Sequence, residues 1–127
     1  HTRCGRDWSS DVCSSDLERN GLQDKVTVVI GSDFGRTPFY NDGRGKDHWN
    51  VTSLMAMGAG VRGNRVIGGT DDHVEALTVN PQSLLPQAGG ITLTPEHIHV
   101  ALRRMAGIEP QLETRFGIAA DALSLFA

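Results

Sequence analysis

The sequence is short of the features that mark several protein classes. Its 127 residues contain two cysteines, Cys4 and Cys13, and both lie within the first 17 residues. These two could form a disulfide or a metal pair. The remaining chain has no cysteine, so cysteine usage does not identify the redox compartment of the protein. No apolar run approaches the roughly 18 residues that span a bilayer. The formal net charge is −3 and Lys and Arg form no cluster, which gives nucleic acid no electrostatic surface to bind.

Motifs that mark common enzyme classes are missing as well. There is no G-x-S-x-G nucleophile elbow, no P-loop and no H-E-x-x-H zinc motif. Residues 58–63 do spell G-x-G-x-x-G, but no helix pattern follows them, so they lack the context of a dinucleotide-binding turn. Any chemistry must therefore come from residues that these motifs do not cover.

The first 17 residues, HTRCGRDWSSDVCSSDL, do not fit the rest of the chain. They show no clear apolar period, and they resemble translated sequencing-adapter read-through, a string found at the ends of fragmentary metagenomic reading frames. We interpret residues 1–17 as an artefactual or disordered segment and exclude them from the fold prediction, with a natural disordered N-terminus as the alternative. Residues 18–127 are enough for one small domain.

Residues 25–49 are the stretch around which a site can be predicted. The β-branched run Val26–Ile30 predicts a buried strand. Asp33 and Arg36 follow it, and a loop rich in Gly, Asn and Asp then ends in the Asp-His-Trp of residues 47–49. Because ligands of open α/β sheets bind beyond the carboxyl ends of the strands, we expect these polar residues to meet at one point. We interpret the stretch as half of an active site whose other half lies outside the chain.

Local patterns predict the remaining elements. Leu17–Asn20 before Gly21 is typical of the last turn of a helix and its glycine stop. Thr52–Met57 predicts a second buried strand, although its Leu and Met residues would also suit a helix. The other predicted elements are a peripheral hairpin from Arg65–Gly68 and Glu75–Val79 and a short terminal helix over Ala119–Phe126.

The clearest predicted helix runs from Pro95 to Ala106. Thr94 is a suitable N-cap, proline suits the first helical position, and Gly107 stops the helix. One apolar face is formed at helical spacing by Ile98, Ala101, Leu102 and Met105.

The predicted site offers ligands for a metal and for an anion. Asp33 and His48 carry hard oxygen and imidazole ligands for a divalent ion such as zinc, manganese, calcium or magnesium, and Asp47 is a candidate to orient them. The alternatives are that Asp33 caps a turn and that His48 stacks beside Trp49 on the surface. The planar guanidinium of Arg36 matches a phosphate or sulfate group, and its alternative is an ion pair with either aspartate.

The other histidines are weaker candidates. His73 follows two aspartates, but its place in a predicted turn favours a solvated residue. His97 and His99 are two residues apart on the predicted helix and therefore point to different sides, so we do not expect them to share a ligand.

Four motifs carry a resemblance to a known family. They are SDFGRTP at 32–38, GKDHW at 45–49, MGAGVRG at 57–63 and VIGGTD at 66–71. Together they resemble the C-terminal part of an uncharacterised bacterial sulfatase-like family, a domain of unknown function that is placed with the alkaline phosphatase superfamily. The resemblance extends over about residues 17–110.

The resemblance implies an α/β fold, an α/β/α arrangement with a mainly parallel sheet, of which residues 18–127 would be the C-terminal part, truncated at the N-terminus. It also implies export by the twin-arginine route, hence a periplasmic or exported location. In active superfamily members, two metal ions hold a phosphate or sulfate ester against a Ser, Thr or modified Cys nucleophile. Asp33 matches the Asp of the superfamily's Asp-His-Gly metal motif, and His48 matches the histidine of a later loop.

Phe34 departs from that pattern, because it stands where the superfamily has a metal-binding histidine. The nucleophile belongs upstream of this chain, so we predict a fragment of a metal-dependent phosphate- or sulfate-ester hydrolase that is inactive alone. The alternatives are a non-catalytic exported protein that uses the same fold for binding, and a plain α/β domain without a site. A parallel sheet needs both faces covered. We therefore expect Leu54 and Met55, with Val28 and Ile30, to lack partners and the chain to be marginally stable and to aggregate.

Overall fold

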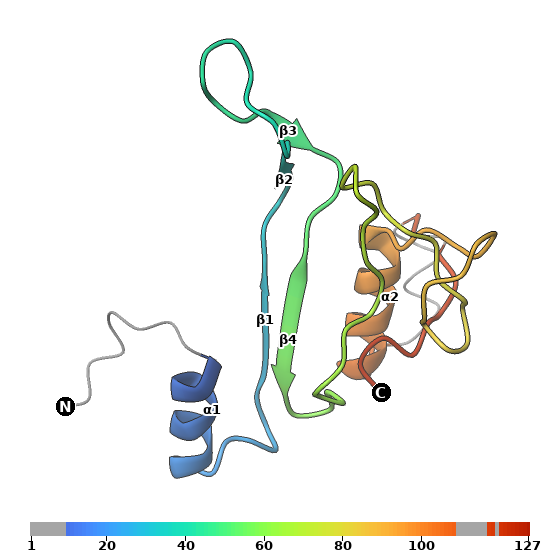
Figure 1. Cartoon of the computed structure of the whole chain (residues 1–127). Helices are drawn as coiled ribbons and strands as arrows, with labels where there is room; N and C mark the ends of the chain where they lie inside the picture. The colour runs from blue at the N-terminus through green and yellow to red at the C-terminus, as the bar shows by residue number, and fades with distance from the viewer. Residues whose placement is uncertain (1–9, 109–116, 119) are drawn as a thin grey trace.

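The computed structural model describes residues 10–108, 117–118 and 120–127 (Figure 1). Its elements follow in the order α1 (Ser10–Arg19), β1 (Thr27–Gly31), β2 (Gly35–Arg36), β3 (His48–Trp49), β4 (Leu54–Gly58) and α2 (Pro95–Met105). β1 pairs with β4 and β2 pairs with β3, which gives two separate two-stranded sheets. Within these ranges, no helix is long and apolar enough to cross a membrane.

Both sheets are antiparallel, so the predicted α/β fold with a mainly parallel sheet is wrong. β1 and β4 run in opposite directions, with Val28 opposite Met57 and Ile30 opposite Met55. Residues 32–53 between them form the β2–β3 hairpin and contain no helix. Parallel neighbours need a crossover connection, usually a helix, whereas a chain that turns back on itself brings in the second strand antiparallel. The described residues therefore do not adopt an alkaline-phosphatase-like α/β/α arrangement.

The two longer strands lie where the sequence predicts them, but they are less buried than predicted. Val29, Leu54 and Met55 are 38%, 41% and 46% exposed, respectively. Ala56 of β4 packs against the hydrophobic core, and in Figure 1 the ribbon of β1 and β4 stands beside α2. A two-stranded ribbon has too few neighbours to bury both of its faces. Leu54 and Met55 are exposed, as expected of residues that lack partners, whereas Val28 and Ile30, for which the same was expected, are half-buried.

The end of α1 follows the prediction of a helix that stops at Gly21. Gly21 has a φ of 64°, the left-handed conformation that glycine adopts readily. Its N–H donates to the Glu18 carbonyl at 3.0 Å, and the N–H of Leu22 donates to the Leu17 carbonyl at 2.8 Å. This pair of bonds is the Schellman pattern, which satisfies carbonyl groups left free at a helix end.

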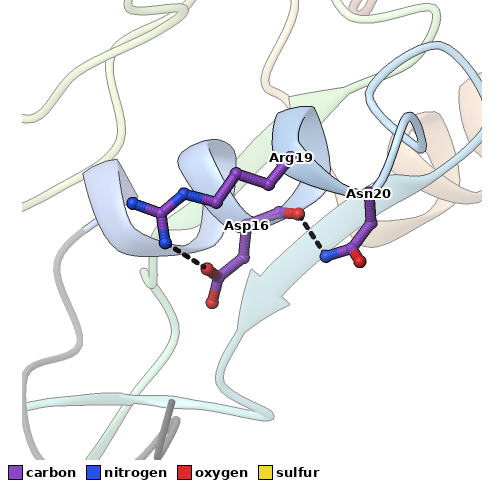
Figure 2. Close-up of polar contacts among 3 residues, drawn as sticks. All are labelled: Asp16, Arg19 and Asn20. Carbon is purple, nitrogen blue, oxygen red and sulfur yellow. Dashed lines mark hydrogen bonds and ion pairs between the residues drawn. The ribbon is translucent and has the colours of Figure 1, made fainter. Parts of the chain in front are cut away.

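Two side-chain contacts form at the same end of α1 (Figure 2). The Asn20 side-chain amide donates to the Asp16 carbonyl oxygen at 2.7 Å, and the Arg19 guanidinium lies 3.9 Å from the Asp16 carboxylate. The ion pair is solvent-exposed and therefore adds little stability. α1 begins at Ser10, inside the segment that we interpret as artefactual or disordered, and residues 1–9 of that segment lie outside the described residues.

Helix α2 confirms the helix predicted over residues 95–106. Thr94 is its N-cap, with φ −123° and ψ 163°, and Pro95 occupies the first helical position. After the helix, Gly107 has a φ of 71° and its N–H donates to the Arg104 carbonyl at 3.0 Å. Both ends of α2 are therefore set by residues that the local sequence identifies.

The hydrophobic core lies between α2 and the C-terminal segment. Its buried residues are Leu84, Ala101, Leu123, Leu125 and Phe126. The predicted apolar face of α2 is confirmed, because Ile98, Leu102 and Met105 pack against this cluster. Among the described residues, Val79 and Val100 are the largest fully buried side chains, and the periodicity of the helix did not mark Val100 as a core residue.

The terminal helix predicted over Ala119–Phe126 is wrong for the residues that are described. Residues 120–127 form no helix, although Leu123 and Phe126 are buried as expected, and residue 119 lies outside the described residues. The backbone carbonyls of this segment instead accept hydrogen bonds from Arg65. Its Nη2 donates to the carbonyl oxygens of Ser124 at 3.3 Å, Leu125 at 2.8 Å and Ala127 at 2.9 Å.

The peripheral hairpin forms only close to its turn. Thr70 and Ala76 make a single antiparallel bridge, and the Leu77 N–H donates to the Gly69 carbonyl at 2.9 Å. Val79, at the end of the predicted second strand, bridges to Ile91 instead. The pairing therefore stays next to residues 71–75, while Val79 enters the buried part of the molecule.

Candidate functional site

The β2–β3 hairpin carries all of the predicted site residues. Arg36 of β2 pairs with His48 of β3, and Gly35 pairs with Trp49. The ladder continues beyond the strands, since the Thr37 N–H donates to the Asp47 carbonyl at 3.0 Å. The Asp47 N–H in turn donates to the Thr37 hydroxyl at 3.1 Å, and Thr37 is only 5% exposed. Strand pairing thus places Arg36 directly opposite His48, although the two residues are distant in the sequence.

Alternation along the hairpin places Phe34, Arg36 and His48 on one side, and we call these three residues the Phe34 stack. The Phe34 and His48 rings are stacked, with centroids 3.7 Å apart and planes inclined by 27°. The Arg36 guanidinium carbon lies 4.8 Å from the Phe34 ring centroid, within the range of a cation–π contact. Arg36 Nη1 also donates to the Lys46 carbonyl at 3.0 Å. Arg36 and His48 are exposed and Phe34 is half-buried, so the stack faces solvent.

Gly35 allows the hairpin to close. A Cβ at this position would lie 1.8 Å from the Val51 carbonyl oxygen and 2.8 Å from the Val51 carbonyl carbon. Both are backbone atoms, so no side-chain rotation could relieve the overlap. The close approach of residue 35 to Val51 therefore requires glycine.

The opposite side of the hairpin is tied to the turn at residues 71–75. The Trp49 indole N–H donates to the Val74 carbonyl at 2.9 Å, and Phe39 meets the Trp49 ring edge-on at 6.1 Å and 81°. Val74 has a φ of 63°, which is unusual for a β-branched residue. His48 lies at the surface, as its alternative had it, but it stacks on Phe34 and not on Trp49. No local pattern indicates the contact between Trp49 and Val74, because 25 residues separate them.

Both predicted carboxylates are used within their own turns. Asp33 Oδ1 accepts hydrogen bonds from the Phe34 N–H at 3.1 Å and from the Ser32 hydroxyl at 3.3 Å. Asp47 Oδ1 accepts from the Asn41 side-chain amide at 2.8 Å. The turn-capping alternative for Asp33 is therefore present in the structure, and Asp47 braces the loop that joins the two strands.

The arrangement does not assemble a complete metal site from the residues that the structure describes. Within that part of the chain, no three or more His, Cys, Asp or Glu side chains lie close enough to share an ion. Asp33 and His48 supply two donors, and Phe34 between them in sequence has no atom that binds a metal. A divalent ion held here would need further ligands from elsewhere, so the metal site stays a prediction.

Arg36 does not form the ion pair that was the alternative to anion binding. Across residues 10–108, no ion pair joins its guanidinium to Asp33 or Asp47. It instead lies over Phe34 and donates one hydrogen bond to a backbone carbonyl. A guanidinium has five N–H donors, so this arrangement leaves donors for an oxyanion.

His73, through its backbone, and His97, through its ring, take part in local structure. The N–H groups of His73 and Glu75 both donate to Asp71 Oδ1 at 2.9 Å. The hydrogen bond from the Glu75 N–H is the largest effect on the pKa of Asp71 and lowers it. Desolvation opposes this effect, and the N–H and charge of His73 add to it, so that the pKa lies below its ordinary value. His97 Nδ1 accepts the Thr94 N–H at 3.1 Å at the start of α2, a capping role that the Thr-x-x-His spacing could have indicated.

A hollow of about 320 Å³ lies elsewhere in the described part of the chain, between α2 and the C-terminal segment. Met105, Leu123 and Phe126 are among the residues that line it, and none of the predicted site residues does. The hollow and the hairpin are therefore separate features of the molecule.

The chain matches the model of a known protein family. Residues 7–87 match a family described as "Protein of unknown function (DUF1501)". The matched residues include the whole β2–β3 hairpin and the turn at 71–75, and they begin within residues 1–17. Comparisons with curated proteins and with solved structures gave no match.

Proposed function

The chain belongs to the DUF1501 family, and we propose from the contacts of its site that the β2–β3 hairpin binds a phosphate or sulfate ester without hydrolysing it. The observation that carries this proposal is the position of Arg36, which lies over Phe34 and is held by the Lys46 carbonyl. An oxyanion would accept hydrogen bonds from the guanidinium and from the neighbouring His48 imidazole.

The Phe34 stack supports binding because it limits the freedom of Arg36 before any ligand arrives. A guanidinium over an aromatic ring at an exposed site gains about 0.5–1 kcal/mol, and the hydrogen bond to Lys46 further restricts its orientation. A ligand therefore meets a charge that has already lost part of its side-chain entropy. The same exposure means that solvent and salt weaken the attraction, so we expect affinity in the millimolar range or weaker.

The stack offers less for hydrolysis than for binding. Phe34 brings no donor or acceptor, and the Asp33 carboxylate already accepts two hydrogen bonds within its turn. A general base must reach the proton that it removes, and a nucleophile must be activated beside it. The contacts of the hairpin hold the stack together and show no such pairing.

The experiment is an NMR titration of the full chain with sodium sulfate and with phenyl phosphate at constant ionic strength. We expect saturable shifts of the backbone N–H groups of residues 34–36 and 47–49. Arg36→Gln should weaken binding about threefold to tenfold, because it removes a charge-assisted hydrogen-bond donor at an exposed site. Arg44→Gln is the matched control, since it removes the same charge from the same hairpin, and should change affinity less than about twofold. Equal losses in the two variants would leave only nonspecific attraction and overturn the proposal.

A metal-dependent phosphate- or sulfate-ester hydrolase is the second candidate, as the sulfatase-like resemblance implies. The observation that favours it is that Phe34, next to Asp33, stacks on His48. The two predicted ligands therefore lie at the same end of the hairpin. Calorimetry of the full chain with Zn²⁺ or Mn²⁺ tests it: saturable binding that Asp33→Asn and His48→Ala each abolish, with chelator-sensitive ester turnover, would support this candidate. Binding of sulfate with no response to metal would favour the first.

A further inference from the structure

The structure assigns Asn20 as a site of spontaneous deamidation whose rate is controlled by the C-terminal cap of α1. Asn20–Gly21 is the one Asn-Gly pair in the sequence. Glycine has no side chain to hinder attack by its own backbone nitrogen on the side chain before it. Asn20 is exposed, so water reaches the reaction site.

The reaction needs only water as a co-reactant. The Gly21 backbone nitrogen loses its proton and attacks Cγ of Asn20. A bond forms between that nitrogen and Cγ, the bond from Cγ to Nδ2 breaks, and ammonia leaves. Water then opens the resulting succinimide at one of its two carbonyls, which yields either aspartate or isoaspartate at position 20.

The cap holds both reacting groups in hydrogen bonds that run back along the helix. The Gly21 N–H donates to the Glu18 carbonyl at 3.0 Å, and the Asn20 side-chain amide donates to the Asp16 carbonyl at 2.7 Å. Figure 2 shows the Asn20 amide directed toward Asp16. Attack on Asn20 therefore requires that both bonds break, so the reaction proceeds through local opening of the helix end.

The product would weaken the same cap. A carboxylate at position 20 cannot donate to the Asp16 carbonyl, and its negative charge would stand at the negative end of the helix dipole. Isoaspartate would also lengthen the backbone between Arg19 and Gly21. A chain that has deamidated therefore re-forms the helix end less favourably than an unreacted chain.

The test compares the full chain in native buffer with the full chain in urea at the same pH and temperature. Mass spectrometry of the peptide that contains Asn20, together with released ammonia, gives the rate. We expect deamidation to be roughly tenfold to thirtyfold slower in native buffer, the factor that two hydrogen bonds of typical net strength provide. Asn20→Gln should abolish the deamidated peptide, which would show that residue 20 is the one that reacts. Equal rates in buffer and in urea would overturn the inference.

A pair of variants separates the cap from general unfolding. Glu18→Pro keeps the Asn20–Gly21 pair, but proline disfavours the helical conformation of the residue before it and lacks an N–H for the helix. We expect Glu18→Pro to deamidate in native buffer at close to the rate in urea, and Glu18→Ala to retain the slow rate. If Glu18→Pro reacted as slowly as Glu18→Ala, the cap would not control the reaction.

Discussion

Gly35→Ala should separate the two strands of the hairpin without changing any residue of the Phe34 stack. The new Cβ would lie 1.8 Å from the Val51 carbonyl oxygen. Nonbonded heavy atoms prefer separations of about 3.5 Å, so the backbones must move apart by more than about 1 Å. Since the overlap is with backbone, residue 35 and Val51 cannot keep their present positions.

The cost follows from what that movement breaks. The hydrogen bond from Thr37 to the Asp47 carbonyl contributes about 0.5–1.5 kcal/mol, and the Phe34–His48 pair contributes a similar amount. The local loss is therefore about 1–3 kcal/mol. A ladder of two residue pairs has little stability of its own, so we expect the hairpin to open while the core around α2 stays folded.

Amide hydrogen exchange, read together with the sulfate titration, checks this expectation. In Gly35→Ala, protection of residues 34–37 and 47–49 should fall and sulfate binding should be lost, while α2 keeps its protection. Gly63→Ala is the matched control, because a Cβ there would meet no atom within 4 Å. If Gly35→Ala kept the protection and the sulfate affinity of Gly63→Ala, the close approach of Gly35 to Val51 would be refuted.

Three further predictions concern stability and solubility. Phe126→Ala should lower the free energy of unfolding by about 3–5 kcal/mol, because Phe126 is only 7% exposed and lies in the core. Phe39→Ala, at a position 58% exposed, should cost much less. Urea unfolding followed by circular dichroism checks both, and equal losses would contradict the core assignment. Asp71 has a lowered pKa in the folded chain, so its contribution to stability should be present above its ordinary pKa of 3.8 and be lost as the pH falls through the lowered value. Asp71→Asn should flatten this acid dependence in urea unfolding at a series of pH values, and an unchanged dependence would exclude Asp71 as its source. Met55→Thr should reduce aggregation, because Met55 is 46% exposed on β4 and threonine suits a strand. Light scattering at equal protein concentration checks this, and unchanged scattering would place the aggregating surface elsewhere.

Local sequence determined the helix ends and the positions of the longer strands. Gly21 and Gly107 stop helices because glycine adopts the left-handed conformation that each stop requires, and Thr94-Pro95 begins α2 because a cap and a fixed φ suit that position. β1 and β4 follow from short apolar runs. These features depend on neighbours in the chain, so the sequence was sufficient to predict them.

The direction of strand pairing and the contacts of the site depended on the tertiary structure. The run of residues 26–30 is compatible with either direction, and the hairpin that follows it, in place of a crossover helix, made the pairing antiparallel. Spacing identified Asp33 and His48, but pairing of β2 with β3 placed His48 on Phe34, while Asp33 turned to its own backbone. The C-terminal residues are apolar enough for a helix, and Arg65, about 60 residues earlier, holds their carbonyls in a nonhelical segment. Such contacts join residues far apart in the chain, so local patterns in the sequence cannot predict them.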